Sequence, residues 1–352
     1  MIDIKFYQKV YQLKKQLMNK EISNSDYVWK KFEEFRSKDP VIYNIETTNA
    51  CNMRCEMCPR TTMMTRPIET LDMETYEKVV NQIKPWSEAD WKQWENFAEK
   101  TYGVPKDEMS ENNFFLYIIP KVITLHGYGD PLLDKDISQR VKLLNSRVKI
   151  PSYFSCNPAN IDVEKTVEVC QNGLDYLKYS MESTDDKAHK EIRGMASDFT
   201  ESYKKILEVL EKKKQLGFKT EIIITMLDLD RPDQQEQWEK LKEKFKGLDV
   251  YIFFKSVDQD WYKKTKETKA IHWTEFCQYP WSSMTIKSDG KVASCAEDYN
   301  NDIILGDAKK DSLYDIWNGQ LYNDFRKAHL ELNVERCIKR CDAKLVGDML
   351  KK

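Results

Sequence analysis

Six short apolar segments alternate with amphipathic helical patterns between residues 41 and 254, and this alternation constrains the fold more than any other feature. The expected strands are Val41–Thr47, Val122–Leu125, Ser152–Ser155, Tyr176–Met181, Thr220–Met226 and Val250–Phe254. Apolar residues recur at helical spacing near residues 72–84, 135–144, 163–171, 202–215 and 234–245. Strands that alternate with helices pair in parallel through right-handed crossovers, so the pattern predicts an α/β barrel of six parallel strands.

The remaining segments flank or interrupt this alternation. Residues 85–120 are rich in Trp and acidic side chains and indicate an insertion, and the alternation ends near Ser256. After it, Asp289-Gly290 predicts a hairpin turn, and residues 313–329 have the pattern of a helix. We therefore expect three domains, namely a helical segment at 1–40, a barrel at 41–256 and a smaller domain at 257–352.

The charge and hydropathy of the chain argue against two kinds of partner. The 56 Lys and Arg residues nearly balance the 58 Asp and Glu residues, and this net charge of −2 predicts no nucleic-acid partner. No apolar run approaches the roughly 18 residues that a membrane-spanning helix needs, and the charged N-terminal residues do not resemble a signal peptide. The expectation is a cytoplasmic protein, with no membrane partner, in a reducing compartment.

The nine cysteines fall into two groups and two single positions. In a reducing compartment such clusters indicate metal binding rather than disulfides. The first group is Cys51, Cys55 and Cys58, spaced C-x3-C-x2-C directly after the first expected strand, where barrels of this kind carry their chemistry. Three thiolates can bind three irons of a four-iron cluster and leave one iron open for another ligand. A zinc ion remains an alternative, although zinc usually takes four ligands.

This loop and the sequence around it resemble the radical S-adenosylmethionine (SAM) superfamily, from about Tyr43 to Cys341. The resemblance implies a partial (β/α)6 radical SAM barrel in which SAM binds the open iron of a [4Fe–4S] cluster. It also implies that one electron, supplied by a donor such as flavodoxin or ferredoxin, cleaves SAM to a 5′-deoxyadenosyl radical that abstracts hydrogen.

The same resemblance assigns residues to SAM. The segment Tyr128-Gly129-Asp130-Pro131 is similar to the Gly-Gly-Glu-Pro segment of the family, and the residue before the third cysteine packs on adenine there. The SAM contacts implied in this way are Met57, Tyr128, Gly129, Asp130, Ser180, Glu182 and Arg193. The alternatives are an ordinary Gly-Asp-Pro turn, solvated loop residues and a surface arginine.

The second cysteine group lies in the last quarter of the chain. Cys277 and Cys295 bracket the expected hairpin, and Cys337 and Cys341 follow the expected helix. The Asp-Gly hairpin, the Gly-Asp step and the Ile-Trp helix resemble the twitch/SPASM extension of radical SAM enzymes. This resemblance implies a small C-terminal auxiliary iron–sulfur domain with a second [4Fe–4S] cluster held by these four cysteines. Four thiolates also suit zinc, which stays an alternative.

The cysteine spacing and the run YGDPLL are similar to those of the 2-deoxy-scyllo-inosamine dehydrogenases of aminoglycoside biosynthesis. This resemblance implies oxidation of a small polar substrate, such as a sugar, an aminocyclitol or a nucleotide sugar, with the auxiliary cluster as electron acceptor. His126, beside the expected SAM segment, is the candidate catalytic base. Two other hypotheses are maturation of a ribosomal peptide by epimerisation or crosslinking, and a non-catalytic iron–sulfur or zinc protein.

Overall fold

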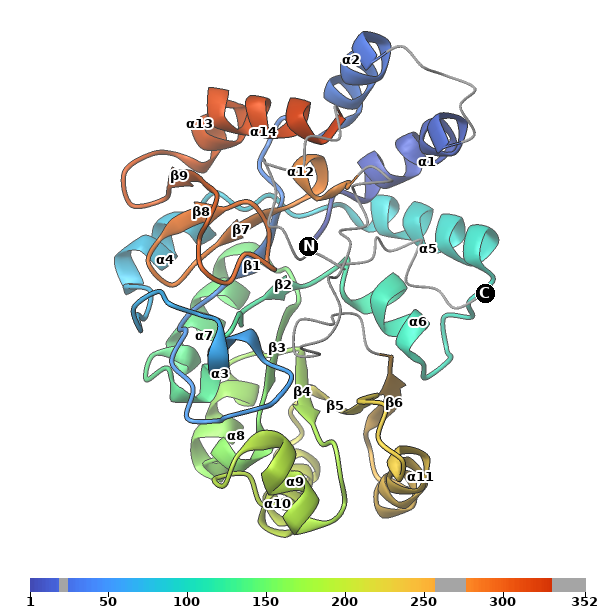
Figure 1. Ribbon diagram of the computed structural model, residues 1–352, viewed down its shortest axis with the longest axis vertical. Helices are drawn as coiled ribbons and strands as arrows, with labels where there is room; N and C mark the ends of the chain where they lie inside the picture. Colours follow the sequence, from blue (N-terminus) through green and yellow to red (C-terminus); the bar gives the residue numbers. More distant parts are fainter. Residues whose placement is uncertain (19–24, 257–276, 331–352) are drawn as a thin grey trace.

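The computed structural model describes residues 1–18, 25–256 and 277–330, which contain one nine-stranded sheet (Figure 1). The strands are β1 (Ile42–Ile45), β2 (Ile123–Thr124), β3 (Ser152–Cys156), β4 (Tyr176–Ser180), β5 (Glu221–Leu227), β6 (Tyr251–Lys255), β7 (Met284–Ile286), β8 (Lys291–Ala293) and β9 (Ile304–Asp307). Their order across the sheet is β6-β5-β4-β3-β2-β1-β7-β8-β9. Strands β1 to β6 all pair in parallel, so the prediction of six parallel strands is confirmed.

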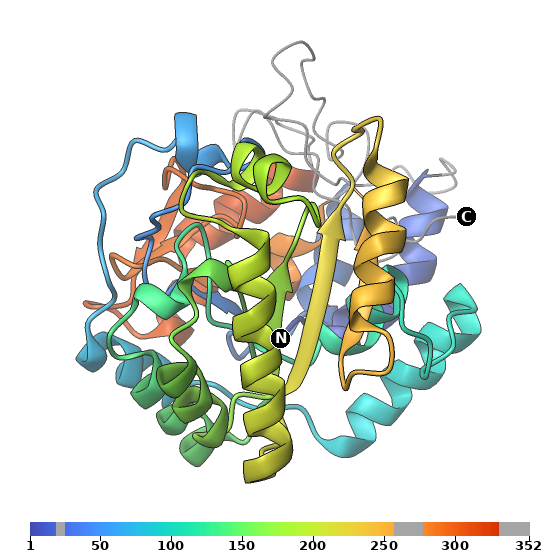
Figure 2. The same cartoon turned by 90° about the horizontal axis from the view of Figure 1, so that it is seen from below.

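Helices lie outside these strands and cover one face of the sheet (Figure 2). They are α4 (Met73–Val80), α7 (Ile137–Val148), α8 (Val163–Gln171), α9 (Asp186–Arg193), α10 (Phe199–Leu216) and α11 (Gln234–Phe245). Several begin at an aspartate that caps the first turn, as Asp72 does by accepting a hydrogen bond from the Thr75 N–H at 2.7 Å. Their apolar faces pack on the outward-facing residues of the strands and form the main buried core.

The inner face of the barrel receives the alternate residues of each strand, because successive side chains of a strand point to opposite faces. In β4, Leu177 and Tyr179 belong to the outer core, whereas Lys178 lines a cavity on the inner side. In β6, Phe253 and Lys255 line that same cavity. Short helical turns follow three strand ends, namely α3 (Pro59–Thr62), η2 (Pro131–Leu133) and η3 (Pro158–Asn160).

The N-terminal helices and the insertion pack together at the side of the barrel. They are α1 (Ile4–Met18), α2 (Ser25–Phe35), α5 (Glu88–Tyr102), α6 (Glu111–Asn113) and the π-helical turn η1 (Phe114–Ile118). Trp94 of α5 is fully buried, and its indole N–H donates to the Leu116 carbonyl at 2.7 Å. Its ring also lies against Tyr7 of α1, with centroids 6.3 Å apart. Trp94 is therefore a core residue that fixes the insertion to α1.

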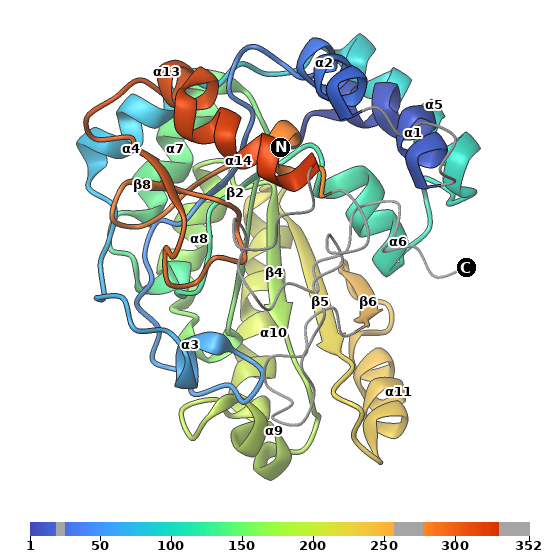
Figure 3. The same cartoon turned by 45° about the horizontal axis from the view of Figure 1, so that its top comes forward.

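The C-terminal strands extend the sheet of the barrel. Strand β7 pairs in parallel with β1, and β8 and β9 continue as antiparallel strands. Helices α12 (Tyr279–Ser282), α13 (Leu313–Asn318) and α14 (Gln320–Leu330) accompany them, and α14 contacts α2 (Figure 3). The helix expected over 313–329 is divided at Gly319, where a Cβ atom would lie 2.7 Å from the Asp315 carbonyl oxygen. No helix within the described ranges combines the length and apolar character that crossing a membrane requires.

Candidate active site

The three clustered cysteines lie in the loop between β1 and α3 and line one cavity of about 330 Å3, here called the cysteine cavity. The loop is held by backbone hydrogen bonds to the end of α9. The Arg54 N–H donates to the Arg193 carbonyl at 3.0 Å, and the Glu56 N–H donates to the Ile192 carbonyl at 2.9 Å. Gly194 permits this approach, since a Cβ there would lie 2.9 Å from the Arg54 nitrogen and its φ is +102°.

The properties of these thiols fit an iron–sulfur cluster. Burial raises the pKa of Cys51, Cys55 and Cys58, and that of Cys58 rises to about 12, so thiolates here need positive charge from a bound metal. In the described part of the chain, no three His, Cys, Asp or Glu side chains lie close enough to hold a single metal ion. A four-iron cluster binds each thiolate to a different iron, so its cysteines are spaced more widely than ligands of one ion. Three thiols around one cavity are the ligand set that leaves one iron of a four-iron cluster open.

The segment after β2 packs directly against the cysteine loop. The Asp130 N–H donates to the Ala50 carbonyl at 2.8 Å, and the Tyr128 N–H donates to a carboxylate oxygen of Glu46 at 2.9 Å. Gly129 has no room for a side chain, because a Cβ would lie 2.7 Å from the Asn49 Cα atom and closer still to the Thr48 carbonyl. Residues 128–130 thus line the cysteine cavity.

The Asp130 carboxylate is directed into the protein. It is 3% exposed and accepts hydrogen bonds from the N–H groups of Leu132 and Asn157, at 3.0 and 2.9 Å, and from the Asn160 side chain at 2.7 Å. Burial raises the pKa of Asp130, and these bonds oppose the rise. The carboxylate therefore fixes the shape of the segment, and its predicted contact with SAM stays a prediction.

Arg193 joins the cysteine loop to the end of β4. It forms a two-pronged ion pair with Glu182, with one N–O distance of 2.6 Å, and its other terminal nitrogen lies 3.7 Å from the Cys55 sulfur. Burial alone would raise the pKa of Glu182, but the Arg193 guanidinium outweighs it and holds this pKa below its ordinary value. Arg193 lines the cysteine cavity, as do Met57, Tyr128, Gly129 and Asp130, whereas Ser180 and Glu182 do not.

His126 lines the cysteine cavity but is poorly suited to the role of a base. Its Nδ1 atom accepts a hydrogen bond from the Ser155 N–H at 3.2 Å, so its remaining proton resides on Nε2. Burial, and then the charge of Lys178, lower the pKa of His126 to about 3. The geometry favours a neutral hydrogen-bond donor, and the role as a base stays a prediction.

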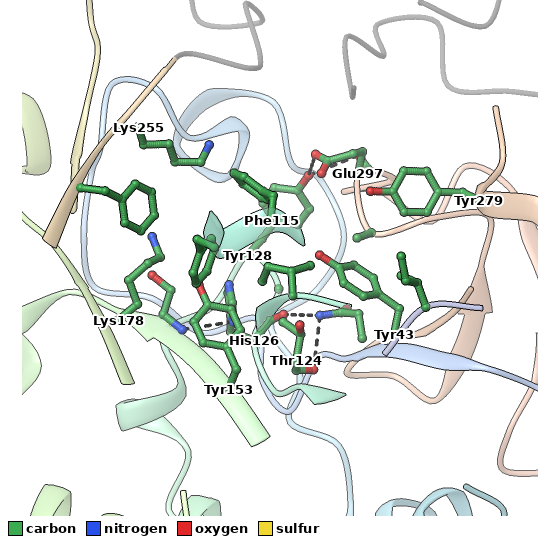
Figure 4. Close-up of a pocket in the computed structure, with 18 of the residues that line it drawn as sticks. Tyr43, Phe115, Thr124, His126, Tyr128, Tyr153, Lys178, Lys255, Tyr279 and Glu297 are labelled. Carbon is green, nitrogen blue, oxygen red and sulfur yellow. Dashed lines mark hydrogen bonds between the residues drawn. The ribbon is translucent and has the colours of Figure 1, made fainter. Parts of the chain in front are cut away.

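A second cavity of about 300 Å3, here called the aromatic cavity, adjoins the first. The two share the side chains or backbone of His126, Gly127, Tyr128, Ser155 and Lys178. Half of the residues in its remaining wall are aromatic, namely Tyr7, Tyr43, Phe114, Phe115, Tyr153, Phe253 and Tyr279. Figure 4 shows Tyr43, Phe115, Tyr153 and Tyr279 around this cavity. The sequence interpretation did not identify this cavity. The inward positions of Lys178 and Lys255 follow from strand alternation, but no sequence signal points to Phe114 and Phe115.

Two of the four auxiliary cysteines, Cys277 and Cys295, lie in the described part of the chain, whereas Cys337 and Cys341 lie outside it. Burial, reinforced by nearby carboxylates, raises the pKa of Cys295 to about 12. The loop after Cys295 reaches the SAM segment, because the Tyr128 hydroxyl donates to the Glu297 carboxylate at 3.2 Å and lies 3.3 Å from its carbonyl oxygen. Tyr128 therefore contacts both halves of the molecule.

Comparison with known proteins agrees with this geometry. The family model of the radical SAM superfamily matches residues 45–244, and that of the SPASM iron–sulfur cluster-binding domain matches residues 277–342. Comparison with curated proteins found no match. Among solved structures, the chain is similar to Streptococcus suis SuiB, with a TM-score of 0.55, 12% identity and coverage of 97% of this chain and 88% of that one.

Two other solved structures are similar over most of the chain. Native anSMEcpe with bound AdoMet has a TM-score of 0.52 and 14% identity over 81% of this chain and 82% of that one. BtrN in complex with AdoMet and 2-DOIA has a TM-score of 0.47 and 13% identity over 86% and 93%. At these identities the likeness to SuiB and anSMEcpe extends to the fold and no further.

Proposed function

The chain belongs to the radical SAM superfamily and carries a C-terminal SPASM domain, and from this premise we propose that it oxidises a small polar molecule, such as a sugar, an aminocyclitol or a nucleotide sugar. SAM and iron–sulfur clusters are its cofactors. When bound, they supply a 5′-deoxyadenosyl radical for hydrogen abstraction and, at the auxiliary site, an acceptor for the second electron.

The proposal gives each cysteine group one [4Fe–4S] cluster. Cys51, Cys55 and Cys58 hold the first, with SAM placed along Met57 and the peptide groups of residues 128–130. Arg193 stands beside Cys55 with its charge balanced by Glu182, so it keeps the loop in place and excludes water from the thiols. Cys277, Cys295, Cys337 and Cys341 hold the second cluster. Ser180 and Glu182 support the SAM site from behind its wall.

The observation that carries this proposal is the aromatic cavity, which adjoins the cysteine cavity and shares five residues with it. A volume of about 300 Å3 is at the small end of ligand pockets, so it suits a compact molecule whose reacting carbon lies at the shared wall. His126 and Lys178 stand at that wall as hydrogen-bond donors that orient the substrate.

Mass spectrometry tests the reaction. Reconstituted enzyme, SAM and reduced flavodoxin are incubated with a candidate substrate that carries deuterium at the reacting carbon. Oxidation should place that deuterium in 5′-deoxyadenosine and give a product two hydrogen atoms lighter than the substrate. A product of unchanged mass that gains one deuterium from heavy water would show epimerisation, as in peptide maturation, and would refute the oxidation.

A further inference from the structure

We propose that the substrate carries an acidic group, a carboxylate or a phosphate, that Lys255 and Lys178 bind in the aromatic cavity. The inference rests on the proposed function, because it names the class of molecule that the same cavity receives. The two lysines extend from strands β6 and β4, which are separated by β5, and both line the cavity (Figure 4).

The positions of the two lysines are fixed by the fold. Lys178 donates hydrogen bonds to the Ser180 hydroxyl at 3.2 Å and to the Thr225 hydroxyl at 3.4 Å, so its ammonium group is directed along the inner face of the barrel. The Lys255 ammonium lies 5.9 Å from the ring centre of Phe115, which is itself part of the cavity wall. Two cations thus face the space that the substrate occupies.

Among the described residues that line the cavity, the carboxylate belongs to Glu297, which lies on a different wall. Glu297 reaches the cavity from the loop after Cys295, and its carboxylate accepts the hydrogen bond from Tyr128 at 3.2 Å. Figure 4 shows Lys178 and Lys255 on one side of the drawn residues and Glu297 on the other. Because aromatic rings line the space beside the lysines, an anion there interacts with their charge more strongly than it would in bulk solvent.

The shared wall sets the orientation of the substrate. Lys178 lines both cavities, whereas Lys255 lines the aromatic cavity alone. The acidic group therefore binds at Lys255, the end remote from the cysteines, and the carbon to be oxidised lies beside Lys178 and His126. In this orientation Lys255 contributes to substrate affinity and has little effect on hydrogen abstraction.

Calorimetry on the reconstituted holoenzyme with SAM gives the first test. Inorganic phosphate and acetate are titrated as probes, with glycerol as the neutral comparison. Lys255→Gln should weaken binding of the preferred anion by about tenfold or more. Lys240→Gln, on the outer helix α11, is the matched control and should change nothing. If neither anion binds the wild type, or if Lys255→Gln binds the anion as tightly, the inference is wrong.

Fractionation of the source cells' metabolites gives the second test. The fraction that stimulates 5′-deoxyadenosine formation should be retained on an anion-exchange column, and Lys255→Gln should raise its KM far more than it lowers kcat. Loss of stimulation after phosphatase treatment would identify a phosphate, and its survival a carboxylate. Stimulation by an unretained fraction that gives an oxidised product would overturn the acidic substrate and leave the oxidoreductase intact. An acidic fraction that gives an epimerised product would support the acidic substrate and overturn the oxidoreductase.

Discussion

The two cavities share a wall, yet they are built from different parts of the chain. The cysteine cavity depends on close approaches of the backbone, at Gly129 against Thr48 and at Gly194 against Arg54. Outside the shared wall, the aromatic cavity is lined by side chains that come from β1, η1, β6 and α12. A backbone site changes little unless the fold changes, whereas a site of side chains changes with single substitutions. Under the function proposed above, the first cavity fixes the reaction type and the second selects the substrate.

The largest expected effect follows from removing the thiols of the cysteine cavity. Replacing Cys51, Cys55 and Cys58 with Ala should lower the iron content from about eight to about four atoms per chain and abolish SAM cleavage. Cys156→Ala is the matched control, because this cysteine lines the same cavity but is outside the predicted ligand set. Iron analysis of the reconstituted proteins is the measurement. Only four irons in the wild type would contradict the assignment of two clusters.

The next effect concerns the buried ion pair behind the cysteine loop. Glu182→Gln leaves the Arg193 charge without its buried partner, so it should lower the free energy of unfolding by about 3–5 kcal/mol. Glu77→Gln breaks a half-exposed pair with Arg147 and should cost less than about 1 kcal/mol. Denaturant unfolding of both variants measures the difference. Equal losses of unfolding free energy would show that the buried Glu182–Arg193 pair stabilises the protein no more than the half-exposed pair does.

The Glu182 pair also predicts a pH dependence. The pKa of Glu182 is lower in the folded state than its ordinary value, so its contribution is complete above that ordinary value and is lost as the pH falls through the folded pKa. As the pH falls below about 4.5, Glu182→Gln should therefore lose less free energy of unfolding than the wild type does. If the unfolding free energy of Glu182→Gln falls with acid pH as steeply as that of the wild type, Glu182 does not cause the pH dependence.

A smaller effect is expected at the wall between the cavities. Tyr128→Phe keeps the ring but removes the hydroxyl that bonds Glu297, and it should cost about 1 kcal/mol of unfolding free energy while SAM affinity stays within about twofold. Tyr314→Phe, which alters a half-exposed ring on α13, is the control. A large loss of SAM affinity in Tyr128→Phe would mean that the side chain, and not the peptide group, forms this part of the SAM site.

The effect that is smallest at neutral pH concerns His126, which is uncharged there in the folded and the unfolded chain alike. Its folded pKa of about 3 lies below the ordinary value of 6.5, so the unfolded chain binds more protons between these values and stability rises with pH across that window. His126→Gln should make this part of the stability profile less steep, as measured by unfolding at several pH values. A kinetic pKa near 6.5 that disappears in His126→Gln would restore His126 as the base.

Much of the barrel was predictable because its strands and outer helices have simple apolar periodicity. The helix expected over 163–171 coincides with α8, and the expected strands overlap β1 to β6. Helix α9 was missed because only His189 and Ile192 are buried in it, which leaves too few apolar positions to show a helical pattern. The addition of β7 to the edge of β1 was also missed, since strand pairing across 240 residues has no local signal.

The candidate site was predictable where the sequence carries a motif. The cysteine spacing and the Gly-Asp-Pro segment identified residues that do line one cavity, and in that segment the close approach to Thr48 restricts position 129 to glycine. The directions of the side chains were not predictable from the sequence. The Asp130 carboxylate points into the protein and accepts hydrogen bonds from Asn157 and Asn160. The insertion supplies Phe114 and Phe115 to the aromatic cavity, most of whose other residues lie far from them in the sequence. Both depend on tertiary packing that sequence patterns do not record.

The pairing of β7 with β1 has a consequence for any attempt to shorten the protein. Strand β1 is bonded on one side by β2 and on the other by β7, so the strand that leads into the cysteine loop has no open edge. A chain ended at residue 256 would expose the unpaired N–H and C=O groups of β1, and such edges recruit other strands. The barrel without the C-terminal strands would therefore tend to aggregate. In the full chain, β7 covers this edge and so limits self-association.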